Sequence, residues 1–144
     1  MKKRISLLLK TLTLLDLVKT YISFINTDVI SLLSMLNENE ELSELCFIKD
    51  CLNEIDDNND FNTSWKTSVN RFNSTLKDGD KEIIISFGLQ LGKSDVQGQI
   101  NNCELHKQQV LCRLNEAEES YKKHGNLCFN LCILSGILID LVLL

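Results

Sequence analysis

One cysteine and one histidine are spaced so that they could do chemistry together. Cys103 and His106 stand three positions apart, which on a helix puts both side chains on one face. A thiolate and an imidazole are zinc ligands, and an imidazole can also activate a thiol as a nucleophile. Zinc would need two further ligands that are not evident, and Cys103 falls in a row of apolar residues. We therefore interpret both as packing residues and expect no catalytic residue, no metal ligand and no cofactor.

A second candidate is the acidic segment from Asp56 to Asp60, whose closely spaced oxygen atoms resemble part of a calcium-binding loop. The glycine and the closing glutamate that such a loop requires are missing at their positions. Turn-forming residues dominate the segment instead. The sequence therefore predicts a solvated loop here.

The composition limits the class of protein. The 144 residues, 44% hydrophobic and 24% charged, are enough for one domain. No proline and only six glycines occur, which favours an all-α fold because proline breaks helices and glycine weakens them. The formal net charge of −5 argues against binding to nucleic acid, which requires a cationic surface. The six cysteines form no CxxC pair, so we expect reduced thiols in a cytosolic setting.

Apolar residues recur at steps of three and four in six segments separated by polar joints. This spacing is typical of helices that pack lengthwise on one another, and short joints make neighbouring helices antiparallel. The sequence predicts a six-helix bundle. Its helices are expected at residues 4–25, 29–36, about 42–55, 62–72 and about 81–91, and from residue 94 onward.

The joint before the last helix has the composition of a tight corner. Phe87 and Leu91 are spaced as core residues on one helix face, and Gly88 between them permits close helix approach. Gly92 can adopt the left-handed conformation that ends a helix. Ser94 and Asp95 can then accept hydrogen bonds from the first turn of the next helix.

The last helix carries an apolar row that only Lys107 interrupts, and the long stem of that lysine can lie along an apolar seam. Polarity stops after Lys122 and Lys123. The members of the row are Val96, Ile100, Cys103, Val110, Leu114, Ala117 and Tyr121.

Residues 127–144 are almost entirely apolar, and as a helix they would span about 27 Å, close to the thickness of a bilayer core. The sequence predicts a C-terminal transmembrane segment that continues the last helix, with a buried core helix as the rival interpretation. Lys122 and Lys123 would mark the membrane boundary and place residues 1–126, the helical domain, in the cytoplasm. The segment after Met1 is interpreted as an amphipathic helix rather than as a targeting signal.

The run from Phe87 to Asp95, with Gln99 and the apolar tail after it, resembles stage III sporulation protein AB. That family has the pattern Phe-Gly-x-x-Leu-Gly-x-Ser/His-Asp before a glutamine-containing helix and a C-terminal anchor. The segment from Ile22 to Thr27 resembles a second, looser family segment, and Trp65 falls where the family often has an aromatic residue. Family members usually begin with another membrane helix, and we do not expect one in the segment that follows Met1.

The resemblance implies a helical domain similar to the cytoplasmic domains of type II secretion system F proteins. It also implies a non-enzymatic scaffold in the complex between mother cell and forespore that endospore formation needs after engulfment. The implied location is the mother-cell membrane around the forespore, with the helical domain in the mother-cell cytoplasm. The implied partners are other proteins of the stage III sporulation A operon, above all the AA ATPase, with homo-oligomers as a further option.

Two other classes stay open at this point. The chain could be a general tail-anchored helical adaptor of another secretion or pilus assembly system. It could also be an enzyme that uses Cys103 and His106.

Overall fold

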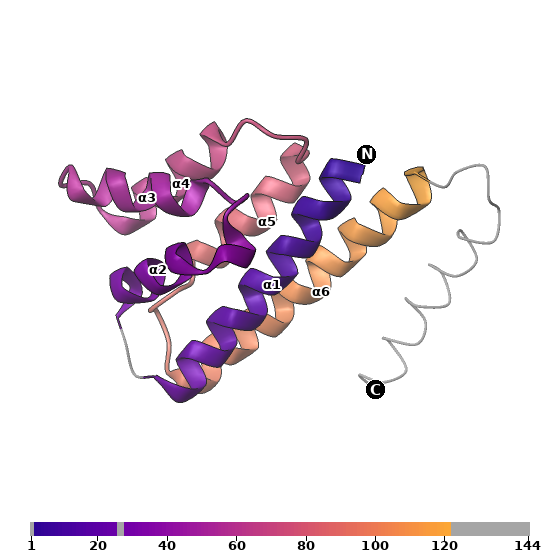
Figure 1. Ribbon diagram of the computed structural model, residues 1–144. Helices are drawn as coiled ribbons and strands as arrows, with labels where there is room; N and C mark the ends of the chain where they lie inside the picture. The colour runs from indigo at the N-terminus through magenta and orange to yellow at the C-terminus, as the bar shows by residue number, and fades with distance from the viewer. Residues whose placement is uncertain (1, 26–27, 122–144) are drawn as a thin grey trace.

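The computed structural model describes residues 2–25 and 28–121, and this part of the chain consists of helices without strands. Figure 1 shows a long pair, α1 and α6, with the shorter helices gathered along one side of it. The predicted all-helical fold with six α-helices is confirmed for the described residues. The elements are α1 (Lys2–Phe24), α2 (Val29–Glu38), the 3-10 helix η1 (Glu40–Leu42), α3 (Phe47–Asp56), α4 (Phe61–Arg71), α5 (Asp78–Leu89) and α6 (Val96–Tyr121).

Helices α1 and α6 lie side by side and run in opposite directions (Figure 1). Charged pairs mark this register: Lys107 Nζ lies 3.1 Å from Asp16 Oδ1, and Lys19 pairs with Glu104. At the far end, Lys2 Nζ lies 5.7 Å from the centre of the Tyr121 ring. Contacts between α1 and α6 therefore extend along nearly the whole length of the two helices.

A single core lies between this pair and the shorter helices. α3 packs on α4, α4 on α5 and α5 on α6, so the chain returns to the long pair. Each large apolar side chain that is fully buried contributes roughly 1.5–3 kcal/mol to stability. The largest buried side chains are Trp65, Phe47, Phe87, Leu7, Leu8, Leu14, Leu33 and Leu36.

The prediction of one helix over residues 42–55 is wrong, because two elements occupy this stretch. The Asn39 side chain accepts a hydrogen bond from the N–H of Glu41 and so starts the short helix η1. The chain then turns before α3 begins at Phe47. This break lets both Leu42 and Leu45 reach the core, where each is 2% exposed.

The acidic segment after α3 is a tight turn, as expected of a solvated loop. Asn58 adopts a positive φ of 71°, and the Asp60 carboxylate accepts a hydrogen bond from the N–H of Thr63. Asp60 therefore caps α4. Helix α5 begins at Asp78, a few residues before the predicted position, because Lys77 serves as its N-terminal cap residue.

The predicted apolar row of α6 is correct in its middle and wrong at its ends. Val96 is 52% exposed and Tyr121 is 43% exposed, whereas Gln99 and His106 are buried. A helix of 26 residues turns every 3.6 residues, so a row counted at 3.5 drifts off the core face. Lys107 lies beside the core face and pairs with Asp16.

A buried ion cluster ties α1, α5 and α6 together, and the sequence did not predict it. Arg4 is 3% exposed and Asp80 is 1% exposed. Arg4 Nε donates to Asp80 Oδ2 at 2.8 Å, and Arg113 Nε donates to Asp80 Oδ1 at 2.7 Å. The N–H of Lys77 donates to the same carboxylate at 2.9 Å. Burial disfavours the charged form of Asp80, but these donors outweigh it and lower the pKa of Asp80 below its ordinary value.

Gly79 makes room for this cluster. A Cβ atom at this position would lie 2.7 Å from an Arg113 guanidinium nitrogen. A residue without a side chain therefore lets Arg113 lie close to the backbone beside Asp80.

The expected membrane segment at 127–144 and its boundary at Lys122 and Lys123 lie outside the described residues. Among the helices of residues 2–25 and 28–121, none is both long enough and apolar enough to cross a membrane.

We expect Asp80→Asn to lower the free energy of unfolding by about 3 kcal/mol or more, because it leaves buried guanidinium charge uncompensated. Urea unfolding followed by the fluorescence of Trp65, the single tryptophan, measures this change. Since the pKa of Asp80 is lower in the folded state, its stabilisation is present above about pH 4 and is lost as the pH falls through the folded-state value. The variant should lack this part of the acid sensitivity.

Asp16→Asn is the matched control. Its carboxylate also pairs with a cation on α6, Lys107, but the Asp16 side chain is 56% exposed. An exposed pair contributes at most about 1 kcal/mol. Equal losses in the two variants would mean that the buried cluster has no special weight.

Candidate functional site

The predicted corner between α5 and α6 is present and has the expected backbone. Gly92 adopts a φ of 79°, which is the left-handed conformation that favours glycine. The Asp95 carboxylate accepts a hydrogen bond from the N–H of Gly98 at 2.8 Å, so Asp95 caps the first turn of α6. Phe87 and Leu91 are 1% and 5% exposed, which confirms both as core residues.

Gly88 permits a very close approach of α4 to α5. A Cβ atom at Gly88 would lie 2.0 Å from Trp65 Nε1, so the indole lies directly against the glycine. The same Nε1 donates to the carbonyl of Ile84 at 2.9 Å, and Phe47 meets the indole edge to face. The core position predicted for Trp65 is confirmed, and the structure explains why a glycine stands opposite it.

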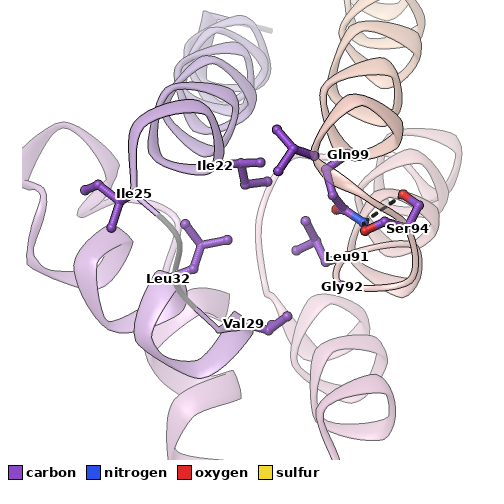
Figure 2. A pocket seen from close by; sticks show the side chains of 9 residues that line it. Ile22, Ile25, Val29, Leu32, Leu91, Gly92, Ser94 and Gln99 are labelled. Atoms are coloured by element: carbon purple, nitrogen blue, oxygen red, sulfur yellow. Dashed lines mark hydrogen bonds between the residues drawn. The ribbon is translucent and has the colours of Figure 1, made fainter.

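An apolar hollow opens beside this corner, and we call it the corner hollow. It has a volume of about 140 Å³ and lies between the end of α1, the start of α2 and the corner that leads into α6 (Figure 2). Aliphatic side chains form most of its wall. Its lining residues are Ile22, Ile25, Val29, Leu32, Leu91, Gly92, Ser94, Val96 and Gln99.

Gln99 is the buried polar side chain of this wall, with 5% of its surface exposed. Its Nε2 donates to Ser94 Oγ at 3.0 Å and to the carbonyl of Gln90 at 3.3 Å. Its Oε1 is buried and finds no hydrogen-bond partner among the described residues. Figure 2 shows the amide nitrogen turned toward Ser94. The amide oxygen has almost no accessible surface, so the hollow does not offer it as an acceptor to a ligand.

Two helix caps hold the walls of the corner hollow in place. Asp28 Oδ1 accepts a hydrogen bond from the N–H of Ser31 at 2.7 Å, and Val29 of the lining follows directly. The hydrogen bonds from the backbone and hydroxyl of Ser31 lower the pKa of Asp28, so it stays ionised at neutral pH. Asp95 accepts a hydrogen bond from the N–H of Gly98 and so caps the helix that carries Val96.

Exposed apolar side chains occur in and next to the lining of the hollow. Phe24, which precedes Ile25 of the lining in the chain, is 84% exposed and is the most exposed of the large apolar side chains in the described part of the chain. Ile25 and Val96, which line the hollow, are 44% and 52% exposed. Apolar surface gathered around a hollow is typical of binding sites.

Cys103 and His106 are both buried. Cys103 is 2% exposed, and burial raises the pKa of its thiol to about 12. His106 Nδ1 lies 2.8 Å from the carbonyl of Asn102, and Nε2 lies 3.2 Å from Ser86 Oγ. In residues 2–25 and 28–121, no group of three or more histidine, cysteine, aspartate or glutamate side chains is placed to hold a metal ion.

The structure thus separates the predicted site residues into two groups. Leu91, Gly92, Ser94 and Gln99 line the corner hollow, whereas Phe87, Gly88 and Trp65 form the core behind it. Sequence reasoning missed the opposite wall, which is formed by Ile22, Ile25, Val29 and Leu32. The signal for that wall was present, because the segment that begins at Ile22 carries the second, looser family resemblance.

Comparison with known proteins gives one match. The family model described as stage III sporulation protein AB matches residues 1–144. No curated protein and no solved structure matches the chain.

We expect Gly88→Ala to destabilise the protein by about 3 kcal/mol, because the added methyl group would overlap the indole of Trp65. Thermal unfolding followed by circular dichroism measures the loss. Trp65→Phe removes the pyrrole ring that touches Gly88, so adding it to Gly88→Ala should cost less than it costs alone. Strictly additive losses in this double-mutant cycle would contradict the proposed contact.

We expect iodoacetamide at pH 8 to modify Cys46 and Cys112, which are exposed, and to leave Cys51 and Cys103 unmodified until the protein unfolds. Burial raises the pKa of both protected thiols to about 12, so almost no thiolate forms at pH 8. Peptide mapping by mass spectrometry with and without urea measures the pattern. Rapid modification of Cys103 in the folded chain would revive its role as a nucleophile.

Proposed function

The chain belongs to the stage III sporulation protein AB family, and from this premise we propose that it is a non-enzymatic, membrane-anchored scaffold. The complex it would serve lies between mother cell and forespore and is needed for endospore formation after engulfment. In this proposal the chain binds other proteins through the corner hollow and positions them at the membrane. The observation that carries the proposal is the coincidence of the hollow with the segments that resemble the family.

Several features support binding rather than catalysis as the role of this site. The hollow is lined mainly by aliphatic side chains, with Ser94 and Gln99 as its polar side chains, and such a lining suits recognition of another chain. The residues with chemical potential, Cys103 and His106, are buried and are accounted for by packing and hydrogen bonds. The hollow lies at the corner between two helices, and a binding surface is positioned more precisely when rigid elements carry it.

The membrane anchor in this proposal is the apolar segment at 127–144, with Lys122 and Lys123 at its cytoplasmic boundary. This places the helical domain in the mother-cell cytoplasm, at the membrane that surrounds the forespore. The AA ATPase of the same operon is the proposed main partner, and copies of the chain itself are a second proposed partner. The proposal also includes a fold similar to the cytoplasmic domains of type II secretion system F proteins.

We expect deletion of the gene in its host to block spore formation after engulfment, and a wild-type copy to restore it. The Val96→Glu variant should fail to restore spores, because it places a charge on the wall of the corner hollow. Heat-resistant spore counts measure the outcome, and fluorescence microscopy of membranes fixes the stage of arrest.

Leu105→Glu is the control variant. Leu105 lies on the same helix and is 57% exposed, but it is not part of the hollow. It should restore spore counts to the wild-type level. Normal sporulation of the deletion strain would remove the sporulation role and favour an adaptor for another secretion or pilus system.

A further inference from the structure

We infer that one end of the long helix pair docks on anionic lipid headgroups. This end is formed by the start of α1 and the last turn of α6, and we call it the lysine end after Lys2 and Lys3. The inference rests on the proposed function, because it takes residues 127–144 as the membrane anchor and names the lipid chemistry beside that anchor. In this orientation the corner hollow faces away from the membrane.

The packing of α1 on α6 brings the first and last described helical turns together. Lys2 Nζ lies 5.7 Å from the centre of the Tyr121 ring. Figure 1 shows the start of α1 and the end of α6 at one end of the pair and the corner that leads into α6 at the other. Helix α6 has 26 residues, so about 38 Å of helix separate the lysine end from the corner.

The length of chain after α6 limits how the domain can face a membrane. Leu127, the first residue of the proposed anchor, follows Tyr121 by six residues. A fully extended chain covers at most about 3.6 Å per residue, so these residues reach no further than about 22 Å. This reach is shorter than α6, which excludes an orientation with the corner against the bilayer. The domain must either stand on the lysine end or lie on its side.

The lysine end carries positive charge that the domain does not neutralise. Lys2 and Lys3 are exposed, and neither forms an ion pair with another described residue. Glu118 and Glu119 of the last turn of α6 are matched in number by the two lysines of the proposed membrane boundary. Anionic lipids attract each lysine near the membrane surface by a factor of about five.

The sides of the domain offer no such charge. Along the length of the pair, the cations Lys19 and Lys107 are already matched by Glu104 and Asp16. Residues 28–72, which form α2, α3 and α4, carry ten acidic and three basic side chains. An anionic membrane therefore repels this segment and favours contact through the lysine end.

Tyr121 is suited to the same interface. Its side chain is 43% exposed, and tyrosine is enriched at the headgroup level, where its ring meets apolar groups and its hydroxyl meets water. The ammonium group of Lys2 lies over the ring. One lysine and one aromatic side chain thus form a pair of the kind found beside membrane spans.

The test uses the full-length chain in lipid nanodiscs, with methyl-labelled isoleucine, leucine and valine. One set of discs contains phosphatidylcholine alone and the other contains phosphatidylcholine with phosphatidylglycerol. Both carry a trace of lipid with a gadolinium chelate on its headgroup, which broadens nearby signals. We expect phosphatidylglycerol to increase the broadening of Ile5 and Leu9, which are close to the lysine end, and to leave Val29 and Val96 at the corner sharp.

A double variant, Lys2→Gln with Lys3→Gln, removes the attraction. We expect it to lower the ratio of docked to undocked chains roughly 30-fold, so that broadening of Ile5 returns to its value in phosphatidylcholine discs. The matched control is Lys66→Gln with Lys93→Gln, which removes the same charge from exposed positions on α4 and at the corner. This control should broaden like the wild-type chain. Melting temperatures close to the wild-type value establish that both variants fold.

Several outcomes would overturn the inference. These are equal broadening of Ile5 in the two lipids, equal losses in the two double variants, or strong broadening of Val29 or Val96. Extraction of the chain from vesicles by alkaline carbonate separates this inference from its premise. Retention in the vesicles without lipid-dependent broadening overturns only the lipid contact, whereas release overturns the anchor and the contact together. Normal spore counts in the deletion strain would remove the sporulation role and leave the lipid contact standing.

Discussion

The carboxylate of Asp80 is the interaction on which the arrangement of the long helices depends. It joins guanidinium groups from α1 and α6, the first and last helices, at a point on α5 that is shielded from water. An ion held in this way tolerates little displacement, because sliding either long helix would leave a buried charge unpaired. The cluster therefore fixes the register of α1, α5 and α6. At their other ends this register brings Ile22 and Gln99 to the same hollow.

The sequence was informative where local spacing carries the information. Helical periodicity located most elements, and the types of residue between Phe87 and Asp95 predicted the left-handed glycine and the capped start of α6. Where partners are distant, local spacing fails. In the sequence, Arg4 belongs to a short basic segment at the N-terminus and Asp80 belongs to a polar turn. Neither segment contains a pattern that predicts a hydrogen bond between residues 76 positions apart. The hollow was missed for the same reason, since its two walls are far apart in the chain.

In the core behind the corner, one glycine determines how two helices pack. Because Gly88 has no side chain, the indole of Trp65 can lie on the backbone of α5 and donate a hydrogen bond to the carbonyl of Ile84. That contact sets how near α4 comes to α5 just before the corner. Two glycines of the corner pattern therefore have a physical basis: packing against Trp65 limits the size of residue 88, and the left-handed backbone favours glycine at residue 92.

The separation of the two walls of the corner hollow has a consequence for biosynthesis. The ribosome synthesises the end of α1 and the start of α2, which form one wall, before it synthesises the corner and Gln99, which form the other wall. A ribosome-bound chain that ends before the start of α6 has no complete hollow to offer. Contacts between such distant segments also form late in folding, since the chain must first close a long loop. Under the proposed function, recruitment is therefore restricted to chains whose synthesis and folding have passed this point, which prevents partners from being bound by unfinished copies.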